Sequence, residues 1–284
     1  MIRALVKRAE TLKEAFDRAI EYSGDVFFLA GGTDLICKAK DQIVPPGMWI
    51  DITGIKDLCK IEDRGNTIHI GSIVTHSDLT DNQLIKQYAP VLADAASQVG
   101  SPQIRNRGTI GGNAGNASPA ADCVTALYTM DTTIHLESPD GKNTMPIEDF
   151  FTGPGKTRIR KNEMITGFSF PKKEGIKGIY LKLGQRRALA ISKVALALSC
   201  LLKDGILHDV KIALGAVAPT VIHASRCEEL LEGKEITAEI IEKASKLVQQ
   251  EACPIDDLRS TKEYRYNMTG VLLEQALKNI VSKD

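Results

Sequence analysis

Two glycine-rich segments contain the residues of this chain that are best suited to hold a ligand. The first comprises Leu29, Ala30, Gly31, Gly32, Thr33, Asp34, Leu35 and Ile36. The second continues to Cys123 and begins with Thr109, Ile110, Gly111, Gly112 and Asn113. Glycine lets the main chain approach a ligand closely, and successive backbone N–H groups can bind phosphate oxygens. We therefore predict two backbone loops that close on one phosphate-bearing ligand. The second segment is too rich in small residues to be a packed helix or strand.

Neither segment matches a common nucleotide-binding motif. The sequence has no Gly-x-Gly-x-x-Gly opening a helix and no Gly-x-x-x-x-Gly-Lys followed by Ser or Thr. Thr33 and Thr109 could still add hydroxyl donors, and Asp122 would suit a ribose hydroxyl or the N–H edge of a ring. The alternative is a pair of surface turns in which Asp34 and Asp122 cap helices. Two segments of similar composition favour the ligand-binding interpretation.

Residues for acid–base or nucleophilic catalysis are sparse. The five histidines are scattered, and none adjoins a serine or cysteine in a nucleophile motif. His69 is expected on the outer surface of a strand, helix capping accounts for His76 as well as chemistry does, and Cys123 is interpreted as a small packed residue. The six cysteines form no Cys-x-x-Cys pair, which argues against zinc or iron–sulfur ligation. A ligand site without an acid–base set favours redox transfer by a bound cofactor.

Composition excludes other classes of protein. The 284 residues include 36 basic and 36 acidic side chains, a balance that argues against nucleic-acid binding. No apolar run reaches the length of about 18 residues that a membrane span needs, and the first residues do not form a signal peptide. We therefore expect a cytoplasmic protein with free thiols. Ten Lys or Arg and two Glu between Pro154 and Arg187 could attract an anionic cofactor or an acidic partner, or simply form a solvated face.

The sequence pattern predicts three consecutive units. In residues 1–55, Thr11 and Glu14 form a capping box for a helix ending near Tyr22, and strands are expected at 26–30 and 48–52. The apolar face of that helix is expected to comprise Leu12, Phe16 and Ile20. Residues 56–172 alternate antiparallel strands with short helices, and 101–108 are expected to be irregular. Residues 173–284 predict an α+β unit with a three-stranded antiparallel sheet and a layer of helices.

Four motifs then resemble one family, the FAD-binding medium subunit of molybdenum hydroxylases such as xanthine, nicotinate and carbon monoxide dehydrogenases. In chain order these motifs lie at 29–35, 103–113, 118–122 and 180–187. The resemblance covers nearly the whole chain. It implies a vanillyl-alcohol-oxidase-like, PCMH-type FAD-binding fold with two subdomains in residues 1–172 and a C-terminal flavoprotein domain in 173–284.

The same resemblance implies a set of FAD contacts and no catalytic or metal-binding residue in this chain. Residues 29–36 and 109–113 would hold the pyrophosphate, and Asp122 would contact the adenine–ribose side. Ile165 would pack against FAD, and Lys182 would reach the flavin end or the phosphates. Ser101 and Arg160 are further candidates in the same clefts.

The resemblance also implies partner chains. Substrate would be hydroxylated at a molybdopterin centre on a large subunit, and two 2Fe-2S clusters on a small subunit would pass electrons to this FAD and on to NAD+ or another acceptor. A purine or a nicotinate-like heterocycle is the expected substrate by family frequency alone. One alternative is a stand-alone flavin oxidase or reductase of the same fold, which would need an acid or base over the flavin. Another is a non-enzymatic binding or assembly subunit.

Overall fold

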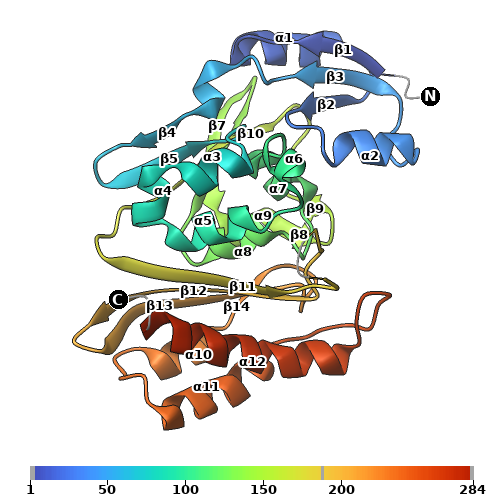
Figure 1. Cartoon of the computed structure of the whole chain (residues 1–284). Helices are drawn as coiled ribbons and strands as arrows, with labels where there is room; N and C mark the ends of the chain where they lie inside the picture. Colours follow the sequence, from blue (N-terminus) through green and yellow to red (C-terminus); the bar gives the residue numbers. More distant parts are fainter. Residues whose placement is uncertain (1–3, 187–188, 282–284) are drawn as a thin grey trace.

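The computed structural model describes residues 4–186 and 189–281, so Arg187 at the end of the fourth motif lies outside the described residues. The elements form three tiers, with the N-terminal unit at the top of Figure 1, a mixed unit in the middle and the C-terminal unit below. This arrangement confirms the expected α+β architecture with helices layered on a C-terminal sheet. No helix in the described ranges has both the length and the hydropathy of a membrane span.

The N-terminal unit is a three-stranded parallel sheet in which β3 lies between β1 and β2. Its elements are β1 (Ala4–Arg8), α1 (Leu12–Glu21), β2 (Val26–Leu29), α2 (Leu35–Lys40), β3 (Gly47–Asp51) and the 3₁₀ helix η1 (Lys56–Cys59). The Thr11 side chain accepts a hydrogen bond from the Glu14 amide, as predicted. The predicted apolar face is wrong at Ile20, which is 58 % exposed, because Ala15, Phe16 and Ala19 form the buried face.

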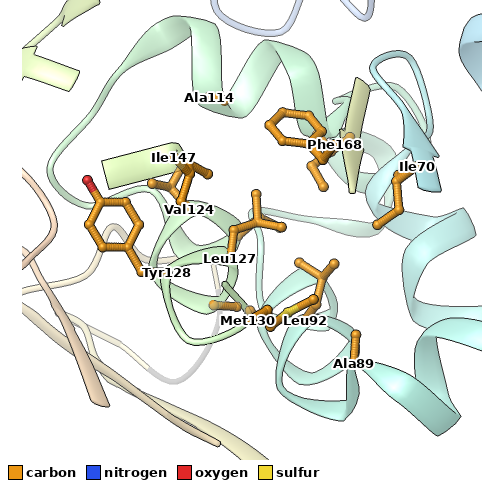
Figure 2. Packing of buried hydrophobic residues seen from close by; sticks show 14 of the residues in the cluster. Ile70, Ala89, Leu92, Ala114, Val124, Leu127, Tyr128, Met130, Ile147 and Phe168 are labelled. Carbon is orange, nitrogen blue, oxygen red and sulfur yellow. The ribbon is translucent and has the colours of Figure 1, made fainter. Parts of the chain in front are cut away.

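The middle unit contains a five-stranded antiparallel sheet in the order β4-β5-β10-β6-β7 and a separate β8–β9 pair. Its strands are β4 (Ile61–Asp63), β5 (Thr67–Gly71), β6 (Thr133–Ser138), β7 (Gly141–Pro146), β8 (Phe151–Gly153), β9 (Lys156–Thr157) and β10 (Met164–Pro171). Its helices are α3 (His76–Asp81), α4 (Gln83–Tyr88), α5 (Pro90–Ser97), α6 (Pro102–Arg105), α7 (Ile110–Asn116), α8 (Asp122–Tyr128) and α9 (Ile147–Phe150). Figure 2 shows side chains such as Leu92, Leu127 and Phe168 meeting in the core between sheet and helices.

One prediction for the middle unit is wrong. Residues 101–108 are not wholly irregular, because Ser101 caps the short helix α6 by accepting from the Ile104 amide. His69 has the predicted outward position on β5, between the buried Ile68 and Ile70, and it lies half-buried beside His135, with ring centroids 5.4 Å apart. Burial, together with the nearby Arg64 charge, lowers the pKa of His69 to about 4, so this imidazole is neutral at physiological pH.

The C-terminal unit is an antiparallel sheet in the order β11-β12-β13-β14, followed by three helices. Its elements are β11 (Ile176–Leu183), β12 (Val194–Lys203), β13 (Ile206–Gly215), β14 (Ile222–His223), α10 (Ser225–Leu231), α11 (Ala238–Gln249) and α12 (Lys262–Val281). The prediction of three strands missed β14, a two-residue strand that is too short to show a periodic pattern.

Strand β12 is buried on both faces, which explains its unbroken apolar sequence. Ala195 and Ala197 face the middle unit and belong to its core, whereas Leu196 and Leu198 face the C-terminal helices. The small alanine side chains let helices of the middle unit approach this sheet closely. On the same face, Ser199 donates to the Thr129 carbonyl oxygen at 2.6 Å, so the two units share a packed and hydrogen-bonded interface.

A histidine between two carboxylates joins the same two units. His223 Nδ1 lies 3.0 Å from Glu228 of α10, and its Nε2 lies 3.3 Å from Glu148 of α9. Burial acts to lower the pKa of His223, but the hydrogen bonds and charges of the two glutamates outweigh it and raise the pKa to about 9. The imidazolium therefore links the middle and C-terminal units at neutral pH.

This link predicts a pH-dependent stability. Because the folded-state pKa of His223 is raised above the usual value of 6.5, its contribution is complete below that pH and is lost as the pH rises through about 9. We expect the free energy of unfolding of the wild type to fall by about 2 kcal/mol relative to His223→Gln across this range, measured by urea denaturation. A difference between the two proteins that does not change between pH 6 and pH 9.5 would contradict the charged state of His223.

Candidate functional site

A cavity of about 770 Å³ lies between the N-terminal unit and the middle unit. Its wall is built from β2 and the turn into α2, from α7, and from residues 159–165 at the start of β10. This size is in the range of small-molecule and cofactor sites. The parallel strand β2 ends at this wall, so the turn that follows it is directed at the cavity, as in other sheets that bind ligands at strand ends.

Most of the residues predicted from the sequence line this one cavity. Thirteen of them do so: Leu29, Ala30, Gly31, Gly32, Thr33, Asp34, Leu35, Thr109, Gly111, Gly112, Asn113, Arg160 and Ile165. The remaining five predicted residues are not part of the lining: Ile36, Ser101, Ile110, Asp122 and Lys182. Segments about 80 residues apart in sequence therefore meet at one site.

The first glycine segment is in direct contact with residues 107–108, which immediately precede the second segment. A Cβ atom placed on Gly31 would lie 1.8 Å from the carbonyl oxygen of Arg107, which is far inside the contact distance. Gly32 has φ +75°, a backbone conformation that L side chains rarely adopt. Glycine at 31 is thus required by the approach of residues 107–108, and glycine at 32 by the turn itself.

Most of the glycine-rich part of the second segment is the helix α7, so the prediction of an open loop is wrong for residues 110–116. Thr109 is the N-cap of α7, with its side-chain oxygen accepting from the Gly112 amide at 3.0 Å. Gly111 lines the cavity with its backbone, but a Cβ atom at this position would point into the protein and lie 2.6 Å from the Ser72 carbonyl oxygen. Gly112 and Gly115 are exposed and line the cavity. Small residues therefore allow α7 to pack tightly on one side and to present bare backbone to a ligand on the other.

The first segment, rather than α7, supplies unpaired backbone donors. The amides of Ile110, Gly111 and Asn113 donate to the carbonyl oxygens of Val74, Ser72 and Thr109 at 2.8–3.0 Å. By contrast, the amides of Gly32, Thr33 and Asp34 donate to no other group in the described part of the chain. The turn between β2 and α2 therefore has backbone N–H groups that could bind a phosphate group.

Polar side chains join the two segments across the cavity. Asn116 donates to Asp34 at 3.1 Å and accepts from Lys38 Nζ at 2.5 Å. Asp34 stands at the N-cap position of α2, as the alternative interpretation expected, but its side chain makes no capping hydrogen bond to that helix. Lys38, Arg160 and Lys161 also line the cavity and place positive charge around it.

Asp122 and Lys182 form a buried ion pair outside the cavity lining. Lys182 Nζ lies 2.7 Å from Asp122, and the two side chains are 10 % and 9 % exposed. Tyr180 and Ser192 also donate to this carboxylate, at 2.6 and 2.8 Å. The N-cap of α8 is Ala121, so Asp122 is not a helix cap either. The pair connects α8 to β11 and hence the middle unit to the C-terminal unit.

Several cavity residues lie outside the sequence-based prediction. Ser72, His76, Val99, Ile104 and Asn116 all line the cavity. The asparagine at 116 was visible in the second segment, but the others stand in helices and turns whose sequence carries no ligand motif. Asn113, which was predicted, is notable because its Oδ1 is buried and has no hydrogen-bond partner among the described residues. Such an atom is costly unless a ligand satisfies it.

These features fit an extended, phosphate-containing cofactor. The turn after β2 offers unpaired amides, α7 offers a surface that side chains at Gly112 and Gly115 would fill, and three cations surround the cavity. In the described residues, no group of three or more His, Cys, Asp or Glu side chains could hold a metal ion. Fold and site together define a protein with a cavity suited to a dinucleotide cofactor.

Comparison with known proteins identifies the family. The model of the FAD binding domain in molybdopterin dehydrogenase matches residues 3–173, and the model of the CO dehydrogenase flavoprotein C-terminal domain matches residues 179–280. The chain belongs to this family of FAD-binding medium subunits of molybdopterin-dependent oxidoreductases, and its cofactor is FAD.

Relatives match along most of their length. The chain is 32 % identical to the glyceraldehyde dehydrogenase medium chain of Sulfolobus acidocaldarius, covering 96 % of each chain. It is 36 % identical to the nicotinate dehydrogenase FAD-subunit of Eubacterium barkeri over 82 % of this chain and 81 % of that one. Among solved structures, a chain of carbon monoxide dehydrogenase from Hydrogenophaga pseudoflava is similar with a TM-score of 0.93 and 30 % identity, covering 99 % and 98 % of the two chains.

Proposed function

We propose that this chain carries electrons within a cytoplasmic molybdenum hydroxylase, from the 2Fe-2S clusters of a small partner subunit to NAD+ or another acceptor. A large partner subunit with molybdopterin would hydroxylate the substrate. The observation that carries this proposal is a glycine-lined cavity in a chain that is similar over 96 % of its length to a dehydrogenase medium chain. The domain boundary proposed for this activity lies at residues 172–173, before β11.

The chain's own residues bind and orient the cofactor in this proposal. The amides of Gly32, Thr33 and Asp34 hold the pyrophosphate, and Asn113 donates to or accepts from a nearby polar group of FAD. Ile165, 6 % exposed, provides an apolar contact. Asp122 and Lys182 act through the position of β11 rather than from the cavity wall. Bound FAD supplies the capacity to take up electrons and to release them as hydride.

A comparison of electron donors tests this proposal. The purified full chain is loaded with FAD and mixed anaerobically with NADH, and then separately with xanthine or nicotinate. We expect NADH to bleach the visible flavin absorption, because the acceptor reaction runs in reverse, and the two heterocycles to leave it unchanged. The chain without FAD is the control.

Each of the other outcomes has a defined meaning. Bleaching by xanthine or nicotinate in the chain alone would contradict the electron-transfer role and favour a stand-alone oxidase. Failure of NADH to bleach a fully loaded flavin would contradict NAD+ as the acceptor. A chain that never takes up FAD would favour an assembly subunit and would contradict the whole proposal.

A further inference from the structure

His76 is a cavity residue that the proposed pyrophosphate site does not use. It is the first residue of α3 and is only 3 % exposed, yet it lines the cavity. Thr75 and Asp78 form the capping box of this helix, so His76 has no capping role. Its amide donates to the Gly108 carbonyl oxygen at 3.1 Å, which fixes the residue beside the start of the second glycine segment.

The two ring nitrogens of His76 have different surroundings. Nδ1 lies 3.4 Å from the Sγ atom of Cys123, which is fully buried. Nε2 lies on the ring edge next to Gly108, where a Cβ atom at 108 would be 3.4 Å from it. The contact with Cys123 is the only hydrogen bond of the His76 ring in the described part of the chain, and it leaves Nε2 without a partner there. One nitrogen is thus tied to a thiol and the other is available to a ligand in the cavity.

The protonation states of His76 and Cys123 leave one N–H group on the ring. Burial, with a smaller effect of Arg105, lowers the pKa of His76 to about 4, so the ring is neutral at pH 7. Burial also raises the pKa of the Cys123 thiol, so Cys123 keeps its proton. A neutral imidazole has one N–H group, and when the thiol donates to Nδ1 that N–H group is on Nε2.

We propose that His76 donates a hydrogen bond from Nε2 to the flavin half of bound FAD. The Ile104 carbonyl oxygen adjoins Gly108 next to the His76 ring. The side chains of Val99 and Ile104 also line the cavity, and these apolar groups suit an aromatic ring system rather than phosphates. This inference rests on the proposed function, in which the pyrophosphate is held by Gly32, Thr33 and Asp34. Cys123, through Nδ1, is a positioning residue that sets the tautomer.

Binding measurements with two ligands separate the halves of the cofactor. Dissociation constants of FAD and ADP are measured on the full chain freed of FAD, for the wild type, His76→Phe and Cys123→Ser. We expect His76→Phe to weaken FAD roughly fivefold to tenfold, the effect of one neutral hydrogen bond, and to leave ADP unchanged. Cys123→Ser keeps a donor to Nδ1 and should bind FAD as the wild type does.

The outcomes distinguish this inference from the proposed function. Equal weakening of FAD and ADP in His76→Phe would place His76 at the pyrophosphate and overturn the flavin contact. Unchanged FAD binding would overturn any contact. Failure of the wild type to bind ADP while it binds FAD would instead contradict the pyrophosphate site.

Nitrogen NMR of the wild type provides a test without substitution. In the FAD-loaded chain labelled at histidine with ¹⁵N, we expect the His76 Nε2 to be protonated and its proton to exchange slowly with water. In the chain without FAD the same proton should exchange faster. A protonated Nδ1 in the loaded protein would overturn the proposal, whatever the behaviour of the variants.

Discussion

We expect the Gly31→Ala substitution to abolish stable retention of FAD, although it adds a single methyl group. The new Cβ atom would lie 1.8 Å from the Arg107 carbonyl oxygen and 2.6 Å from its carbon, and both are main-chain atoms that cannot rotate away. The two segments must separate, and the unpaired amides then move away from α7. Overpacking of a well-packed site can cost about 3 kcal/mol. If this cost is lost from the binding free energy of FAD, the dissociation constant rises roughly 100-fold. The dissociation constant of FAD, measured by titration of the chain freed of cofactor, checks this value.

Gly155→Ala is the matched control. Gly155 lies outside the cavity lining, has φ +68° and has no atom within 4 Å of an added Cβ. Its substitution costs about 1–2 kcal/mol of backbone strain but leaves the cavity intact, so FAD affinity should stay as in the wild type. Wild-type FAD affinity in Gly31→Ala, at equal folded fraction, would show that the contact between the segments is not needed for binding.

Asp122→Ala is expected to destabilise the whole chain by roughly 3–5 kcal/mol, because it leaves the buried Lys182 ammonium without its counter-charge. Tyr180 and Ser192 lose their acceptor at the same time. Urea denaturation followed by circular dichroism and by the fluorescence of Trp49, which is buried in β3 and is the chain's only tryptophan, measures this cost.

The double variant Asp122→Leu with Lys182→Met separates charge from packing. Removing both charges together is expected to restore much of the lost stability, since buried pairs often contribute little net stability relative to apolar residues of similar volume. A cost below about 1 kcal/mol for Asp122→Ala alone would contradict the buried pair. If folded Asp122→Ala also binds FAD normally, the carboxylate does not contact the cofactor.

Much of the fold could be predicted because its elements carry local signals. The capping box of α1 and the apolar strands expected at 26–30 and 48–52 are short-range patterns that the structure reproduces in α1, β2 and β3. The elements missed, such as β14, have no pattern of their own and exist because a neighbouring strand offers hydrogen bonds. The helix α7 was missed because its glycines have low intrinsic helix propensity, and tight packing against Ser72 together with the Thr109 cap overrides that preference.

The residues of the candidate site could also be predicted where they carry a local sequence signal. Gly31 and Gly32 can be recognised in the sequence because their main-chain conformation and close contacts allow only glycine. Which of them face a ligand and which face the protein is decided by long-range contacts, as Gly111 and Gly112 show. His76 has no sequence signal, because its environment comes from Cys123 and Gly108, both far away in the chain.

The contact between Gly31 and residues 107–108 has a consequence for biosynthesis. The cavity wall draws on positions from Ser23 to Ile165, so no amino-terminal fragment emerging from the ribosome holds a finished site until more than half of the chain has been made. The first unit supplies only one side of the cavity, through β2 and the turn into α2. A complete enclosure for FAD therefore requires the middle unit to have docked on the first.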